Sequence, residues 1–555
     1  MTKECEATAA KGGNAGGARA FQAGLWAQLA PQPLLGQSAP DTLLLSFSFP
    51  VPHRPQHRMP QRAVWGLAAA EARQPEREGV RKSREDEAGM SSKKNKQDLN
   101  PCLVVADKDG NIYDEPDLCM VVRRGSQWGT PRPDELTPLP KESELFLLPG
   151  RRAIGLDPET GETVQHEALA VAAFAAPGYT LSAHPAYEAE PDAPMLPLFA
   201  YGAVGYADGR FWICARKVDE DQRQQFRHIP AKRIDDNVRR LLKTYPKNRL
   251  VDHILNDCVR RYDCPAARNF ALGRFEAPLP TSRTCNARCI GCISEQGEDS
   301  PIAVTPQCRL TFTPTPEEIV EVMRIHAERE LKTPIYSFGQ GCEGDPLMNA
   351  DLLCEATRLF RAEGGKGTVN CNSNSSQPKA VERLAQAGLT SLRVSLNSAR
   401  EEVYTRYYRP CGYTFADVVE SISVARKNGI FVSLNLLFFP GVTDTEAELA
   451  ALSRLVGEHG VSMIQWRNLN IDPDYYLSLL DGLEMGPSMG LRAFMKRLRK
   501  NCPWIRYGYF NPYVGEKAEL SAPMPGEWSM PDPEDNAACL SPEEEEALQD
   551  GEKSE

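Results

Sequence analysis

Three cysteines lie close together in the segment Thr284-Cys285-Asn286-Ala287-Arg288-Cys289-Ile290-Gly291-Cys292, and they constrain this chain more than any other feature. Thiolates are soft ligands that select zinc, copper(I) or iron–sulfur clusters. A structural zinc site uses four ligands, and no second pair of cysteines at zinc-knuckle spacing follows downstream. The segment therefore predicts a metal centre with one coordination position left open for a substrate or cofactor.

The spacing of Cys285, Cys289 and Cys292, with three and then two residues between them, resembles the signature of the radical S-adenosylmethionine (radical SAM) superfamily. The resemblance implies that the three thiolates bind one [4Fe-4S] cluster and that S-adenosylmethionine (SAM) binds its fourth iron. It also implies an enzyme that cleaves SAM to a 5′-deoxyadenosyl radical, which abstracts hydrogen from a substrate. Gly291 departs from the pattern, because many members carry an aromatic residue before the last cysteine.

Other interpretations of these cysteines stay open at this point. A zinc site completed by a distant histidine, His253 or His326, is one, and three unligated thiols are another. Among enzymes the rival is a radical methyl- or methylthio-transferase acting on RNA or a peptide. Outside enzymes it is a metal-binding or redox-sensing protein. The resemblance further implies an electron donor such as flavodoxin or ferredoxin. The sequence does not identify the substrate, which could be a small molecule, a peptide or RNA.

Composition narrows the partners and the compartment. The chain has 555 residues and a formal net charge of −11, which argues against non-specific nucleic-acid binding, so DNA is not an expected partner. Sixteen cysteines without a secretory signal or an apolar run of membrane length indicate a reducing cytoplasm and no membrane association.

The chain divides by composition into six segments. Residues 1–97, rich in Ala, Gly, Pro, Gln and Arg, are expected to be a disordered extension or, alternatively, a mis-started one, with translation beginning at Met90. Residues 98–230 carry strand and hairpin signals and predict a small β-rich domain. The remaining segments are a helical linker (231–275), the core (276–480), a helical and aromatic extension (481–526) and an acidic disordered tail (527–555).

The core shows strands and helices in alternation. Thr315-Pro316-Glu317-Glu318 predicts a capped helix over 316–330, and strand-like runs recur at 335–338, 368–372, 391–396, 430–435 and 462–466. Helices closed by glycine lie between these runs. With one strand before Cys285, six units can be counted, and the pattern predicts an α/β fold with a parallel sheet. The resemblance implies that this sheet is the superfamily's partial (β/α)6 TIM-type barrel. Functional residues should then lie at the carboxyl ends of the strands.

The loop after the second predicted strand is rich in glycine, which allows a close approach to a ligand. Its end resembles the Gly-Gly-Glu-Pro motif with which the superfamily holds the amino group of SAM, although Asp replaces Glu. We expect SAM contacts here from Gly341, Glu343, Gly344, Asp345 and Pro346.

Polar residues end the later strands and can hold a ribose or substrate without adding charge. By resemblance Ser395 and Asn397 contact SAM, and Asn435 and Arg467 are expected to face the same cavity, where an arginine can pair with a carboxylate or phosphate. The other cysteines of interest, Cys258, Cys264, Cys342, Cys371 and Cys411, are interpreted mainly as small buried side chains, with a catalytic or ligating role open for the last three. A single cluster is expected.

Overall fold

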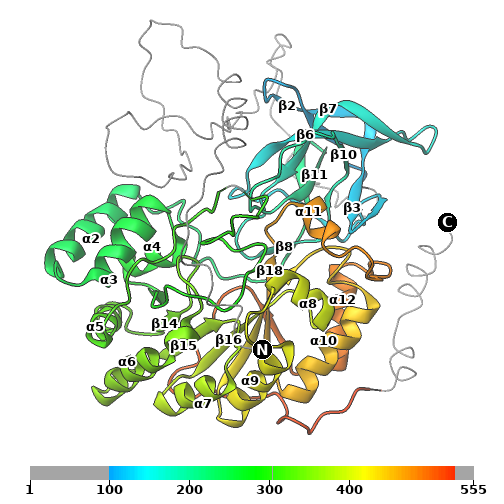
Figure 1. The fold of residues 1–555 in the computed structure, drawn as a ribbon. Helices are drawn as coiled ribbons and strands as arrows, with labels where there is room; N and C mark the ends of the chain where they lie inside the picture. The colour runs from blue at the N-terminus through cyan, green and yellow to red at the C-terminus, as the bar shows by residue number, and fades with distance from the viewer. Residues whose placement is uncertain (1–98, 303, 532–555) are drawn as a thin grey trace, which may run out of the picture. The chain divides into compact units, whose positions relative to one another are not determined.

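The computed structural model describes residues 99–302 and 304–531 (Figure 1). The expected N-terminal extension therefore lies outside the described residues, as does the tail from residue 532. The tail was expected to begin at 527, but Trp528 is held in place, since its indole N–H donates to the carbonyl of Asn501 at 3.2 Å.

The first part of the described chain is β-rich, as predicted. Most of its strands form one antiparallel sheet of nine strands, and β4, β3 and β9 form a smaller one. The hairpin β11–β12 turns at Asp208 and Gly209, which both have positive φ (50° and 76°), as a tight two-residue turn requires. The strands are β1 (Cys102–Ala106), β2 (Ile112–Met120), β3 (Val122–Arg124), β4 (Gln127–Gly129), β5 (Leu136–Pro138), β6 (Leu145–Leu156), β7 (Thr163–Ala173), β8 (Tyr179–Leu181), β9 (His184–Pro185), β10 (Tyr187–Ala189), β11 (Gly202–Ala207) and β12 (Arg210–Lys217).

A helical segment follows the β-rich region. It consists of α2 (Ala231–Thr244), α3 (Arg249–Asp252), the π-helix η2 (His253–Arg261) and α4 (Pro265–Leu272). The break after α2 falls at the predicted Tyr245-Pro246. The π-helical geometry of η2 was not foreseen.

The core is a parallel sheet whose strands follow one another in chain order from β13 to β19. Six strand–helix units precede a short seventh strand, β19, which the prediction lacked. The pairings among the described residues leave β13 and β19 as the two edges, so the sheet is an open one of partial-barrel type. The strands are β13 (Glu276–Leu279), β14 (Ile335–Phe338), β15 (Thr368–Ser373), β16 (Ser391–Leu396), β17 (Phe431–Phe438), β18 (Met463–Asn468) and β19 (Arg506–Gly508).

Helices lie between these strands in the chain (Figure 1). The predicted capping box is present at Thr315, and Gly388 and Gly460 end their helices in the left-handed conformation. The helices are α5 (Pro316–Ala327), η3 (Pro346–Asn349), α6 (Ala350–Ala362), α7 (Pro378–Ala387), α8 (Glu401–Tyr408), α9 (Phe415–Lys427), α10 (Glu446–His459), α11 (Pro473–Ser478) and α12 (Leu491–Asn501).

The two faces of the parallel sheet differ in chemistry. The register places Tyr336, Val369, Leu392 and Leu434 on one face, where they join the helices in a single apolar core. The opposite face is polar, because side chains alternate along each strand. Its polar members are Glu276, Ser337, Asn370, Asn372, Ser391, Arg393, Ser395, Ser433, Asn435, Gln465 and Arg467.

Buried polar contacts connect the β-rich region to the core. Arg151 and Asp472 form a salt bridge of 2.7 Å, with side chains only 4% and 3% exposed. Thr180 donates to the carbonyl of Trp466 at 3.0 Å, and the amide of Gly125 donates to that of Pro440 at 2.8 Å. The domain boundaries expected from composition remain predictions.

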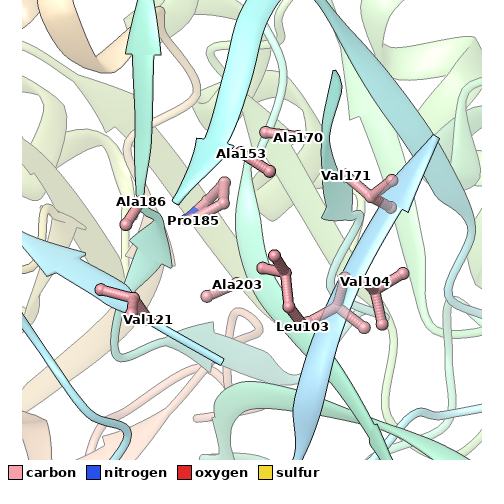
Figure 2. A pocket seen from close by; sticks show the side chains of 10 residues that line it. Leu103, Val104, Val121, Ala153, Ala170, Val171, Pro185, Ala186 and Ala203 are labelled. Carbon is pink, nitrogen blue, oxygen red and sulfur yellow. The ribbon is translucent and has the colours of Figure 1, made fainter. Parts of the chain in front are cut away.

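The β-rich region also encloses a small apolar pocket (Figure 2). Leu103, Val121, Ala153, Ala170 and Ala203 are among its lining residues, and all are buried. Because its lining is aliphatic, this pocket offers no group for catalysis. Within the described residues, no helix is both long and apolar enough to cross a bilayer.

Candidate functional site

The cysteine loop (residues 284–292) follows β13, the first strand of the parallel sheet, at its carboxyl end. Cys285, Cys289 and Cys292 are all partly exposed and free of disulfide bonds. The amide of Ala287 donates to the sulfur of Cys285 (3.4 Å), and the guanidinium of Arg309 donates to that of Cys292 (3.6 Å). Two of the three sulfur atoms on this partly exposed loop therefore already accept hydrogen bonds.

The connection after α8 holds the cysteine loop along its length. The amide of Ile290 donates to the carbonyl of Tyr407 (3.1 Å), and the amide of Cys411 donates to that of Asn286 (2.8 Å). A Cβ atom on Gly291 would lie 2.6 Å from the hydroxyl of Tyr407. The absence of an aromatic residue at position 291 is thus matched by an aromatic ring that α8 supplies from outside the loop.

The donor set of the cysteine loop fits an iron–sulfur cubane better than a single ion. Ligands of one ion must approach one another closely, whereas the thiolates of a cubane bind different irons. Among the described residues, one group of three ligand side chains has its donor atoms within 4.8 Å of one another, and it contains none of these three cysteines. Nor does His326, which contacts the carbonyl of Phe275 at 3.2 Å, complete a zinc site with them.

The glycine-rich loop (residues 339–346) follows β14 and pairs with the cysteine loop through the backbone. The amide of Gly344 donates to the carbonyl of Ser282 (2.8 Å), and the amide of Asp345 donates to that of Thr284 (2.9 Å). A Cβ atom on Gly344 would lie 2.0 Å from that Thr284 oxygen. Only glycine permits this approach, so the two predicted cofactor loops form one structural unit.

Glu343 fixes the shape of this unit. One carboxylate oxygen accepts the amides of Gly339 and Gln340 (2.9 and 2.7 Å), and the other accepts those of Thr281 and Ser282 (2.7 and 2.8 Å). Burial raises the pKa of Glu343 to about 8, and the backbone donors act against this rise. Four amide donors favour the ionised form. Both oxygens are therefore engaged within the protein.

Asp345 is also engaged. Its carboxylate accepts the hydroxyl of Ser373 (2.8 Å), the last residue of β15, and the amide of Asn374 (2.7 Å), the residue after it. It caps η3 as well, through the amide of Leu347 at 3.0 Å. Burial raises the pKa of Asp345. Pro346 is the first residue of η3, and a Cβ on Gly341 would clash with Ile293 at 2.5 Å.

The residues expected on later strands are placed as follows. Ser395, Asn435 and Arg467 lie on the polar face of the sheet, with Ser395 opposite Asn435 in register. Arg467 stacks on Tyr509, its guanidinium 3.9 Å from the ring centre, and donates to the carbonyl of that residue. Asn397 is fully buried and donates to the hydroxyl of Tyr476 (3.1 Å), so it braces the connection after β16.

Arg393 on the polar face was missed from the sequence. It donates to Gln465 (3.2 Å), while its buried Nε has no hydrogen-bond partner. Burial, followed by the neighbouring Arg467, lowers the pKa of Arg393 to about 10. The alternation in Ser391-Leu392-Arg393-Val394-Ser395 could have revealed it, because residues 391, 393 and 395 must share one face.

The remaining cysteines of interest occupy different surroundings. Cys371 is buried on the apolar face of the sheet, and Cys411 is partly exposed in the connection after α8. Cys342 is buried beside His253 and Cys258. Hydrogen bonding from Cys258, together with that from His253, lowers the pKa of Cys342 to about 6 against the effect of burial.

Comparison with known proteins gives matches in the core. Residues 279–452 match the sequence profile of the Radical SAM superfamily. GTP 3′,8-cyclase of Thermodesulfovibrio yellowstonii is 28% identical over 183 residues, which is 33% of this chain and 53% of that protein. Molybdenum cofactor biosynthesis protein 1 of Mus musculus is 29% identical over 180 residues, 32% of this chain and 26% of that protein. The chain spans about half the length of the first curated relatives it matches.

Two solved structures also resemble the chain. The HydG maturase of Carboxydothermus hydrogenoformans is 16% identical, with 45% of this chain and 68% of that one covered and a TM-score of 0.28. Methylornithine synthase is 17% identical, with 48% and 75% covered and a TM-score of 0.28. The profile match begins at the end of β13 and includes both the cysteine loop and the glycine-rich loop. Members of the matched superfamily use a [4Fe-4S] cluster held by three cysteines, with SAM. Residues 279–452 of this chain thus carry the sequence pattern of the radical SAM superfamily.

Proposed function

We propose that this chain is a radical SAM enzyme in which Cys285, Cys289 and Cys292 hold a [4Fe-4S] cluster. The observation that carries the proposal is the backbone pairing of the cysteine loop with the glycine-rich loop at the carboxyl ends of β13 and β14. When bound, the cluster and SAM together supply the electron transfer and the 5′-deoxyadenosyl radical that begin hydrogen abstraction. The chain's own residues hold both loops in register and line the polar face below them.

The contacts within the glycine-rich loop indicate different roles for its carboxylate side chains and its backbone. Glu343 and Asp345 each give their carboxylate oxygens to backbone and hydroxyl donors of the protein. We assign them the task of shaping the loop, so that backbone groups around Gly341 and Gly344 meet the amino acid part of SAM. Ser395 and Asn435, side by side on the polar face, are assigned to SAM or substrate. Asn397 is assigned a bracing role.

The substrate in this proposal carries a negatively charged group. Two arginines, Arg393 and Arg467, share the polar face, and the unpartnered Nε of Arg393 can donate to an incoming oxygen. An arginine pairs bidentately with a carboxylate or a phosphate. The matched relatives are named for GTP, an anion of this kind, so GTP is a substrate to try first. A reductant of the flavodoxin or ferredoxin type completes the proposed system.

The test is anaerobic reconstitution of the full chain with iron and sulfide, followed by SAM and dithionite. We expect 5′-deoxyadenosine and about four irons per chain. Bound zinc in the cysteine loop without turnover would instead support a non-enzymatic metal-binding protein. Deuterium transfer from a labelled candidate, GTP included, into 5′-deoxyadenosine identifies the substrate. The variant Arg393→Gln should weaken its binding more than it changes SAM cleavage without substrate.

A further inference from the structure

A second group of soft ligands lies away from the cysteine loop. His253 and Cys258 come from the π-helix η2, and Cys342 comes from the glycine-rich loop. All three side chains are buried, and their donor atoms lie within 4.8 Å of one another. We call this group the His–Cys–Cys cluster.

The distances in the His–Cys–Cys cluster match those around a tetrahedral ion. The sulfur of Cys258 lies 3.6 Å from that of Cys342 and 3.6 Å from Nε2 of His253. Zinc bonds of about 2.3 Å to sulfur and about 2.0 Å to nitrogen, at tetrahedral angles, separate two sulfurs by about 3.8 Å and a sulfur from a nitrogen by about 3.6 Å. The ligands are thus already spaced as one ion requires.

The π-helix explains how two of the ligands meet. His253 and Cys258 are five residues apart, and in an α-helix they would point about 140° away from each other. In a π-helix the backbone hydrogen bonds join residues i and i+5, so two side chains with this separation lie toward the same side of the helix. A π-helical run over His253–Arg261 is unusual, and such turns are frequent at functional sites.

Asp257 orients the histidine. Its carboxylate lies 3.0 Å from Nδ1 of His253, so a proton on Nδ1 leaves the Nε2 lone pair facing Cys258. A carboxylate behind the second ring nitrogen is the usual support of a metal-bound histidine. The next thiol along this segment is Cys264, whose amide donates to the carbonyl of Cys258 at 2.8 Å.

We propose that His253, Cys258 and Cys342 bind one Zn²⁺ ion, separate from the iron site of the cysteine loop, with Cys264 as the candidate for the fourth position. Both sulfurs bind as thiolates, so any proton that a thiol of the cluster still carries is released to solvent on binding, and no electron is transferred. The ion joins η2 to the glycine-rich loop one residue before Glu343. It therefore stabilises the loop that our proposed function assigns to SAM, yet its presence does not depend on that function.

The experiment separates the two metal sites. The full-length triple variant Cys285→Ala, Cys289→Ala, Cys292→Ala cannot hold the proposed iron cluster. We expect it to retain about one zinc per chain by elemental analysis, with sulfur and nitrogen neighbours in the X-ray absorption spectrum. Adding Cys258→Ser or Cys342→Ser should remove this zinc. Cys502→Ser, at a buried cysteine elsewhere, should retain it.

A cobalt titration, combined with circular dichroism, distinguishes loss of the metal site from misfolding of the variant. Co²⁺ added to the metal-free triple variant should give thiolate-to-cobalt absorption, and His253→Gln should weaken it at least tenfold while circular dichroism stays unchanged. The proposal is overturned by a folded chain without stoichiometric zinc, or by zinc that survives loss of both Cys258 and Cys342. A Cys258–Cys342 disulfide in protein purified with reductant would also overturn it. Failure of SAM cleavage alone would bear only on the proposed function.

Discussion

Cys285, Cys289 and Cys292 lie on one partly exposed loop, whereas His253, Cys258 and Cys342 come from a π-helix and a loop distant in sequence and are at most 8% exposed. The first set is close in sequence, and its donor atoms do not gather within the distance that one ion requires. The second is spread over 90 residues of sequence and already has such spacing. The contrast teaches that closeness of ligands in sequence and closeness of their donor atoms in space are separate properties, and that only the second decides whether one ion can be held.

The largest expected effect is loss of the metal centre in the cysteine loop while the His–Cys–Cys cluster keeps its zinc. Cys289→Ala should abolish the broad visible absorption of the cluster and reduce 5′-deoxyadenosine formation to background, because a cubane site with two thiolates cannot be held. Zinc content should stay at about one per chain, since the His–Cys–Cys cluster shares no ligand with the loop. An unchanged absorption spectrum would contradict the ligand assignment.

A second substitution tests the buried His–Cys–Cys cluster. Asp257→Asn removes the carboxylate behind His253, and we expect zinc affinity to fall by about 10- to 100-fold. Competition with a coloured chelator measures the affinity. Asp252→Asn is the matched control and should change the affinity little, because the Asp252 carboxylate, on the neighbouring turn, accepts the side-chain amide of Asn256. Equal losses in both variants would argue against a metal-supporting role.

A third change tests how the outer loop is packed. Gly291→Ala places a methyl group 2.6 Å from the Tyr407 hydroxyl, and overpacking of this kind costs about 1–3 kcal/mol. Tyr407→Phe in the same chain should relieve part of that cost, because the nearest remaining ring atom is 3.3 Å away. Thermal unfolding and iron content measure both variants. Identical destabilisation with and without the hydroxyl would show that this contact is not the cause.

The smallest expected effect concerns the side chain of Asn374, which makes two hydrogen bonds beside the cysteine loop, one of them from the amide of Ser376 to its Oδ1 at 3.0 Å. The amide group of Asn374 donates to the side chain of Asn286 at 2.8 Å. Asn374→Ala should lower the free energy of unfolding by about 1 kcal/mol and leave zinc content unchanged. Chemical denaturation under anaerobic conditions measures it, with Asn428→Ala on the exposed end of α9 as a control. A loss of zinc in this variant would mean that the two metal regions are coupled more tightly than their separate ligands suggest.

Local sequence signals predicted most strands and helices of the core. Capping residues at Thr315, helix-ending glycines such as Gly388 and runs of apolar residues are each read within a few positions, and the structure places the strands where these signals put them. Strand β19 escaped because it has only three residues, too few for a pattern. The cysteine loop was recognisable because its ligands are adjacent in sequence.

Features that depend on distant partners could not be predicted. The contact between Gly291 and Tyr407 joins residues more than a hundred positions apart, and nothing near either residue signals the other. The engagement of both oxygens of Glu343 follows from a fold that brings Thr281 beside it. The His–Cys–Cys cluster also required η2 to adopt π-helical geometry, since ordinary helical periodicity separates His253 from Cys258.

The salt bridge between Arg151 and Asp472 bears on whether the core of this chain can be produced without the β-rich region. Asp472 also receives the amide of Leu196 at 2.9 Å, so two of its partners belong to the β-rich region. Excising residues 99–230 would remove both of these partners and open Asp472 to water, leaving its carboxylate with the amides of Asp474 and Tyr475 in α11. The core is therefore not independent of the β-rich region: a shortened form would lose a buried ion pair together with the surface that covers it, and should be less stable than the full chain.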